Sequence, residues 1–168
     1  MKVIPLKDHV LLKNSEVVKN YEWLKKLLMN EEEITTELIQ SLSDKKQIFI
    51  NNILPEIKKN AISEWELKSD NICIDQGEDK NDWKRCSICH TNIRYVCPLK
   101  NKHNNNELQL GTTCAEYFGF NGDRNMNKVK IEAKKLRLLE RLNNEFPGIK
   151  NKIENWKDKI KNFEVIIP

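Results

Sequence analysis

The stretch that decides the fold is Cys86-Ser87-Ile88-Cys89-His90-Thr91-Asn92-Ile93-Arg94-Tyr95-Val96-Cys97, followed after a short interval by Gly111-Thr112-Thr113-Cys114. It holds four of the five cysteines of the chain. Two thiols separated by two residues, with two more downstream, have the spacing of a structural zinc site. We therefore predict one structural Zn²⁺ per chain, bound by the thiolates of Cys86, Cys89, Cys97 and Cys114. An ion with four protein ligands has no open coordination position, so it would stabilise structure and perform no chemistry.

Other interpretations of these residues remain open. The thiols can be reduced and packed as small apolar groups, or paired as disulfides. His90 and His103 are competing fourth ligands, although His90 directly follows Cys89 and His103 lies at the tip of a predicted hairpin. The fifth cysteine, Cys73, lies between two isoleucines and is expected to be a buried apolar residue and not a ligand.

The segment around the cysteines is predicted to form a knuckle, a β-hairpin and the start of a helix. The hairpin would consist of strands over 91–99 and 108–110, with a polar tip at 101–106. Cys114 would open the helix, where the helix dipole favours an anionic ligand. This order of elements is typical of a treble-clef-type zinc finger.

The stretch 86–118 also resembles a finger module of uncharacterised bacterial and phage proteins. The recurring form of that module is Cys-x-x-Cys, then Ile-Arg-Tyr-Val-His, a hairpin, and Gly-x-x-Cys-Ala. The corresponding residues here are Cys86, Cys89, Ile93 to Cys97, and Gly111 to Ala115. The sequence departs from the module at Cys97, where a His is frequent, and either residue type can bind zinc. The resemblance implies no activity.

The rest of the chain is predicted to be helical, which gives a mainly α fold with a small β-hairpin zinc module, in the α+β class. Apolar residues at helical spacing predict helices over 17–29, from 31 to 39 and from 44 to 57, with Ser15 and Ser43 as N-caps. Pro55 is expected to kink or divide the third of these helices. Residues 2–6 are expected to form an edge strand, and residues 69–82 a polar loop.

The most regular helical pattern covers residues 126–146. Its apolar stripe consists of Met126, Val129, Ala133, Leu136, Leu139, Leu142 and Phe146. Pro147 and Gly148 end this helix, and a last helix begins at Ile149, so the two should form an antiparallel hairpin. A short strand is expected over 163–168. The predicted organisation is an acidic helical region at 1–82, the zinc-finger module at 83–123, and a basic helical hairpin with a short strand at 124–168, packed as one compact unit.

The charge changes sign along the chain, although the formal net charge is only +4. Residues 1–82 carry 12 basic and 16 acidic side chains, a net −4, whereas residues 124–161 carry 12 basic and 5 acidic ones, a net +7. Such an asymmetry indicates an anionic partner, although abundant Lys, Asn and Ile are also expected from an AT-rich genome. The candidate residues for binding nucleic acid or another partner lie on one helix face and on the hairpin: Lys130, Lys134, Arg137, Arg141, Arg94 and Tyr95.

The sequence favours a non-catalytic protein. It has no Gly-rich phosphate loop, nucleophile elbow or His-Glu-x-x-His motif. A zinc deaminase needs a Glu beside its first ligand and an open metal site, and the sequence predicts neither. We predict a zinc protein that binds DNA or RNA through its basic C-terminal helices. The alternative is a phage- or plasmid-type protein that binds and inhibits or modulates a host nucleoprotein or defence complex through protein contacts. We expect no membrane partner, no secretion signal and a cytoplasmic location, in a bacterial cell or phage-infected host, and the oligomeric state is left open.

Overall fold

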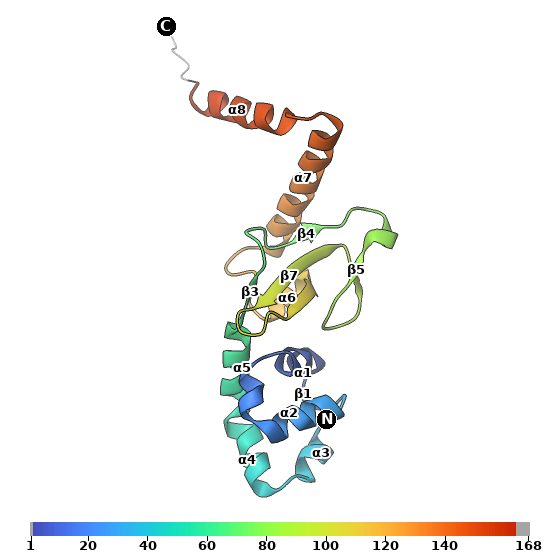
Figure 1. Cartoon of the computed structure of the whole chain (residues 1–168), viewed down its shortest axis with the longest axis vertical. Helices are drawn as coiled ribbons and strands as arrows, with labels where there is room; N and C mark the ends of the chain where they lie inside the picture. The colour runs from blue at the N-terminus through green and yellow to red at the C-terminus, as the bar shows by residue number, and fades with distance from the viewer. Residues whose placement is uncertain (1, 164–168) are drawn as a thin grey trace.

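The N-terminal part of the chain is a group of short helices. In the computed structural model, which describes residues 2–163, these helices lie together at the lower end of the molecule (Figure 1). They are α1 (Leu6–Lys13), the 3₁₀ helix η1 (Val17–Asn20), α2 (Glu22–Asn30), α3 (Thr36–Gln40), α4 (Asp44–Asn52) and α5 (Leu54–Ser63). Pro55 divides α4 from α5, as predicted, because a proline is tolerated only in the first turn of a helix.

A small antiparallel sheet forms the middle of the molecule. Its central strand is β7 (Tyr95–Asn101). One edge of β7 pairs with β3 (Trp65–Leu67) and β4 (Ile74–Asp75), and the other edge pairs with β8 (Glu107–Gly111). Two further pairs are β1 (Lys2–Ile4) with β2 (Ile34–Thr35), and β5 (Lys84–Arg85) with β6 (Asn92–Ile93). The described chain is therefore mainly helical with small β-sheets, in agreement with the predicted mixed class.

Glu64 joins the N-terminal helices to the sheet. Its buried carboxylate accepts hydrogen bonds from the backbone N–H groups of Glu16 and Val17, both at 2.6 Å, and from the Asn101 side chain at 2.8 Å. A buried carboxylate is stable only when donors surround it. The same parts of the chain also share one continuous core of buried apolar residues, which extends from the N-terminal helices through the sheet to α7 (Met126–Glu145).

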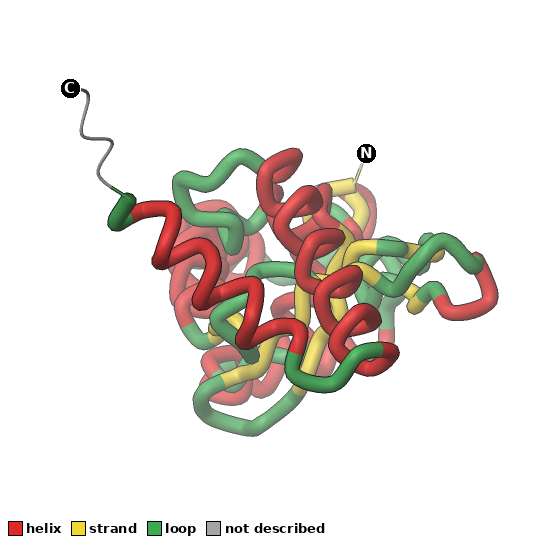
Figure 2. The backbone as a smooth tube through the Cα atoms, turned by 90° about the horizontal axis from the view of Figure 1, so that it is seen from above, coloured by secondary structure: helices red, strands yellow, loops and turns green. Residues whose placement is uncertain are grey.

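The C-terminal helices extend away from the sheet at the opposite end from the N-terminal helices (Figure 1), and in the view from above they lie in front of the rest of the chain (Figure 2). Helix α7 buries Met126, Val129 and Ala133 near its start, whereas α8 (Ile149–Lys161) buries none of its residues. The prediction of a packed antiparallel hairpin is therefore wrong for most of α8. The predicted final strand at 163–168 lies, apart from Phe163, outside the described residues.

Helix α1 was not predicted, and three local predictions for the N-terminal part were wrong. Within the helix predicted from 31 to 39, residues 34–35 form β2, and the helix α3 begins only at Thr36. Ser15 is no N-cap: its hydroxyl donates to the Leu11 carbonyl and accepts from the Trp65 indole. Residues 74–75 of the predicted polar loop form β4, which positions Cys73 and Asp75 beside β7.

Candidate metal centre

The first two predicted metal ligands lie on a tight turn between β5 and β6. The Cys86 N–H donates to the Thr91 carbonyl at 2.9 Å, and the His90 N–H donates to the Cys86 carbonyl at 3.0 Å. His90 has a φ of 59°, in the left-handed region that closes such turns. The turn places the Cys86 and Cys89 thiols on the same side of the chain.

Cys114, another predicted ligand, reaches this turn from α6 (Thr112–Tyr117), which begins directly after β8. The Ser87 N–H donates to the Gln109 carbonyl at 2.8 Å, and the Gln109 N–H donates to the Ser87 hydroxyl at 2.9 Å, so the turn is attached to β8. A Cβ atom at Gly111 would lie 2.8 Å from the side chain of Ile93, so only glycine allows β8 to pass β6 this closely. Cys114 thus enters the site from the first turn of α6.

The sulfur atoms of Cys86, Cys89 and Cys114 lie within 4.8 Å of one another. A tetrahedral zinc ion with Zn–S bonds of about 2.3 Å needs sulfur atoms about 3.8 Å apart, so the three thiols fit one such ion with small adjustments. Cys86 and Cys114 are buried and Cys89 is half-buried. Among residues 2–163, this is the one group of His, Cys, Asp or Glu side chains with such a geometry.

The pKa values of Cys89 and Cys114 are shifted in opposite directions. Burial raises the pKa of Cys89, but hydrogen bonds with Thr91, Cys86 and Cys114 outweigh burial and lower the pKa to about 7. Burial and the neighbouring Cys86 raise the pKa of Cys114 to about 12. Without a cation the three thiols therefore cannot all ionise at neutral pH, and a bound divalent metal would supply the missing positive charge.

Cys97, predicted as the fourth ligand, forms a disulfide with Cys73. The cause is the strand register: Ile74 faces Val96 and Asp75 faces Tyr95 in the antiparallel pair, so Cys73 falls opposite Cys97. This bond corrects the predicted ligand set, because the Cys97 sulfur is not a free thiolate here. Cys73 is buried, as predicted, but it is covalently bonded as well. Both histidines considered as substitutes are exposed and lie outside the cysteine cluster.

Two of the predicted partner-binding arginines instead hold a buried carboxylate. Arg94 donates to both oxygens of Asp75, at 2.7 and 3.1 Å, and Arg137 of α7 donates to the second oxygen at 3.0 Å. The Gly77 N–H adds a fourth hydrogen bond at 3.1 Å. Burial alone would raise the pKa of Asp75, but these donors outweigh burial and lower the pKa to about 2. This cluster could not be predicted, because a single acidic residue in a polar segment has no distinguishing pattern.

The other candidate binding residues differ in their exposure and in their contacts with neighbouring side chains. Lys130 is half-buried and Lys134 is exposed, and neither forms an ion pair with any described residue. Arg141 is exposed and paired with Glu145 at 3.0 Å, an interaction that water screens strongly. Tyr95 is half-buried beneath the Arg94 guanidinium, whose carbon lies 5.2 Å from the ring centre.

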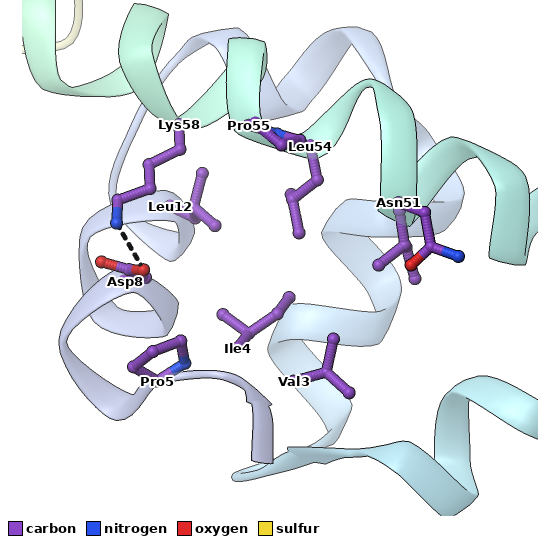
Figure 3. A pocket seen from close by; sticks show the side chains of 10 residues that line it. Val3, Ile4, Pro5, Asp8, Leu12, Asn51, Leu54, Pro55 and Lys58 are labelled. Atoms are coloured by element: carbon purple, nitrogen blue, oxygen red, sulfur yellow. Dashed lines mark ion pairs between the residues drawn. The ribbon is translucent and has the colours of Figure 1, made fainter. Parts of the chain in front are cut away.

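A separate cavity of about 340 Å³ lies among the N-terminal helices, remote in sequence from the cysteines. Figure 3 shows apolar side chains around it, with the ion pair of Asp8 and Lys58 on one side. The Lys58 ammonium lies 2.7 Å from the second carboxylate oxygen of Asp8. The other oxygen of Asp8 is buried and has no hydrogen-bond partner among the described residues.

Comparison of the chain with protein families, characterised proteins and solved structures finds no match. Within residues 2–163, no helix combines the length and the apolar character needed to cross a membrane.

Proposed function

We propose that this chain is a non-catalytic zinc protein that binds DNA or RNA through the basic face of α7. The metal would have a structural role. Cys86, Cys89 and Cys114 would hold it, and together they join the β5–β6 turn to the start of α6. When bound, the ion would supply the charge that keeps all three thiols ionised.

One observation carries the nucleic-acid proposal: Lys130 and Lys134 lie one turn apart on α7 and form no ion pair within the described residues. An unpaired ammonium can neutralise a phosphate without first breaking an internal contact. Arg141 lies on the same helix face two turns further on, and its exposed pair with Glu145 is easily exchanged for a phosphate. Arg94 and Arg137 have the different role of anchoring α7 to the sheet through Asp75.

The proposal is tested with the double variant Lys130→Glu and Lys134→Glu. Binding of a fluorescent duplex DNA and of a single-stranded RNA of mixed sequence is measured by anisotropy at several salt concentrations. We expect binding to weaken at every salt concentration. For duplex DNA, the negative slope of log affinity against log salt should become shallower by about 1.8, at about 0.9 for each lost phosphate contact.

The matched control carries the same charge change at Lys25 and Lys59, which are exposed on α2 and α5. It should bind nearly as tightly as the wild-type protein and keep its salt dependence. Equal weakening by both double variants would show that only net charge matters. Unchanged affinity in the α7 variant would exclude this face as the binding surface.

A further inference from the structure

Helix α8 carries an apolar stripe that is half-buried at Ile149 and Ile153 and exposed further along the helix. Trp156 is 60% exposed, and Ile160 and Phe163 are each 75% exposed. The stripe consists of Ile149, Ile153, Trp156 and Ile160 of α8, separated by four, three and four residues, and Phe163 continues the spacing just after the helix ends at Lys161. This alternation is the a and d pattern of a heptad repeat, in which apolar side chains form a seam for a second helix.

Lysines occupy the positions that border this seam. With Ile153 and Ile160 at a, and Ile149 and Trp156 at d, the neighbouring e and g positions are Lys150, Lys152, Lys157 and Lys159. All four are exposed, and none forms an ion pair with a described residue. The acidic residues of the helix, Glu154 and Asp158, lie at b and f on the opposite side. In paired helices the e and g charges determine which partner is accepted.

We infer that α8 is a docking helix for an amphipathic helix of another protein, with apolar residues at a and d and Glu or Asp at e and g. Such a helix would cover the apolar seam and place a carboxylate beside each bordering lysine. The inference is independent of nucleic-acid binding by α7, because it uses side chains of α8 alone.

The same pattern disfavours the other possible occupants. In a pair of α8 helices from two copies of this chain, lysine would face lysine in both the parallel and the antiparallel orientation. The stripe covers about 60° of the helix surface, at 3.6 residues per turn, which is the narrow seam of a helix pair and not a broad membrane-binding face. A nucleic acid would leave Ile153 and Ile160 without a suitable contact, because bases stack on aromatic side chains.

The test uses the full-length protein and a designed probe, a 21-residue helical peptide with Ile at a, Leu at d and Glu at e and g. A second peptide carries Lys at e and g. Isothermal titration should show binding of the acidic peptide and not of the basic one. The triple variant Lys152→Glu, Lys157→Glu and Lys159→Glu should lose at least tenfold in affinity for the acidic peptide and gain affinity for the basic one. Because α8 buries none of its residues, the thermal unfolding of the variant should not change.

Two further variants separate seam pairing from simple charge attraction. Trp156→Ala with Ile160→Ala keeps every lysine and should also lose at least tenfold in affinity for the acidic peptide. Three reversals away from the seam, at Lys25, Lys59 and Lys161, should leave that affinity within about threefold. The inference is overturned if the alanine variant binds as tightly as the wild type, or if the off-seam reversals are as harmful as those in the seam.

Three other outcomes also overturn the inference. The first is failure of the wild-type protein to bind the acidic peptide. The second is a dimer at micromolar concentration that the alanine variant abolishes, since α8 would then pair with a second copy. The third is binding to anionic phosphatidylserine vesicles without any binding of the acidic peptide. Loss of nucleic-acid binding in the α7 variant is measured separately, so failure of one proposal is distinguishable from failure of the other.

Discussion

Replacing Asp75 by Asn should destabilise the fold measurably, because Asp75 is the shared partner of two arginines. Its side chain is fully buried, while those of Arg94 and Arg137 are only 21% and 26% exposed. The folded pKa of about 2 against an ordinary value of 3.8 corresponds to about 2.5 kcal/mol at neutral pH, at about 1.4 kcal/mol per tenfold change in proton affinity. Asn keeps the shape but leaves Arg137 without its carboxylate partner and Arg94 with only the exposed Glu78 at 3.9 Å, so we expect a loss of about 2–4 kcal/mol in the free energy of unfolding.

The pH dependence gives this prediction a second, independent readout. A carboxyl whose pKa is lowered by folding stabilises the protein above its unfolded pKa and loses that effect as the pH falls through its folded pKa. The contribution of Asp75 should thus be complete above about pH 5 and fall to roughly half at pH 3.

Urea unfolding of the wild type, Asp75→Asn and the exposed control Asp123→Asn at pH 7 and pH 3 measures both effects. Coinciding urea midpoints of the wild type and Asp75→Asn at pH 7 would refute the reasoning. A stability gap that stays constant between pH 7 and pH 3 would also refute it.

The remaining predictions concern the metal centre and the core. Elemental analysis should find about one zinc per chain; Cys89→Ser should abolish binding, and a chelator should lower the thermal transition. Cys97→Ser should keep its zinc, since Cys97 is bonded to Cys73, and loss of the metal would instead make Cys97 a ligand. Leu28→Ala should cost about 2–5 kcal/mol in urea unfolding because Leu28 is fully buried, whereas Leu138→Ala on the exposed side of α7 should cost under about 0.5 kcal/mol. Similar losses for the two leucine variants would contradict the assignment of the core.

Elements with a strong local signal could be predicted from the sequence. Helix α7 has apolar residues at helical spacing over its whole length, and Pro55 marks the division between α4 and α5 within two residues. The spacing of Cys86, Cys89 and Cys114 indicated a common site because a knuckle and a helix start have fixed local geometry.

Features that depend on distant residues could not be predicted. Helix α1 buries Asp8 and His9, so its pattern is not that of an amphipathic helix, and Asp8 is stabilised by Lys58 from α5. The pairing of Cys73 with Cys97 follows from the register of a two-residue strand that is too short to show a period of two. The extension of α8 was missed for another reason: the local pattern specifies an apolar face but not what covers it.

Because β7 lies at the centre of its sheet, the cysteine-bearing segment should not fold when it is separated from the rest of the chain. Residues 83–123 contain β7 and β8, but β3 and β4 come from the preceding part of the chain. A peptide of that segment alone would expose the backbone donors and acceptors along one side of β7, a surface that recruits strands from other molecules. It would also lose Asp75 beneath Arg94 and Glu64 beside Asn101. Transfer of the cysteine cluster to another protein would therefore require the whole sheet, together with α5, the helix that directly precedes β3.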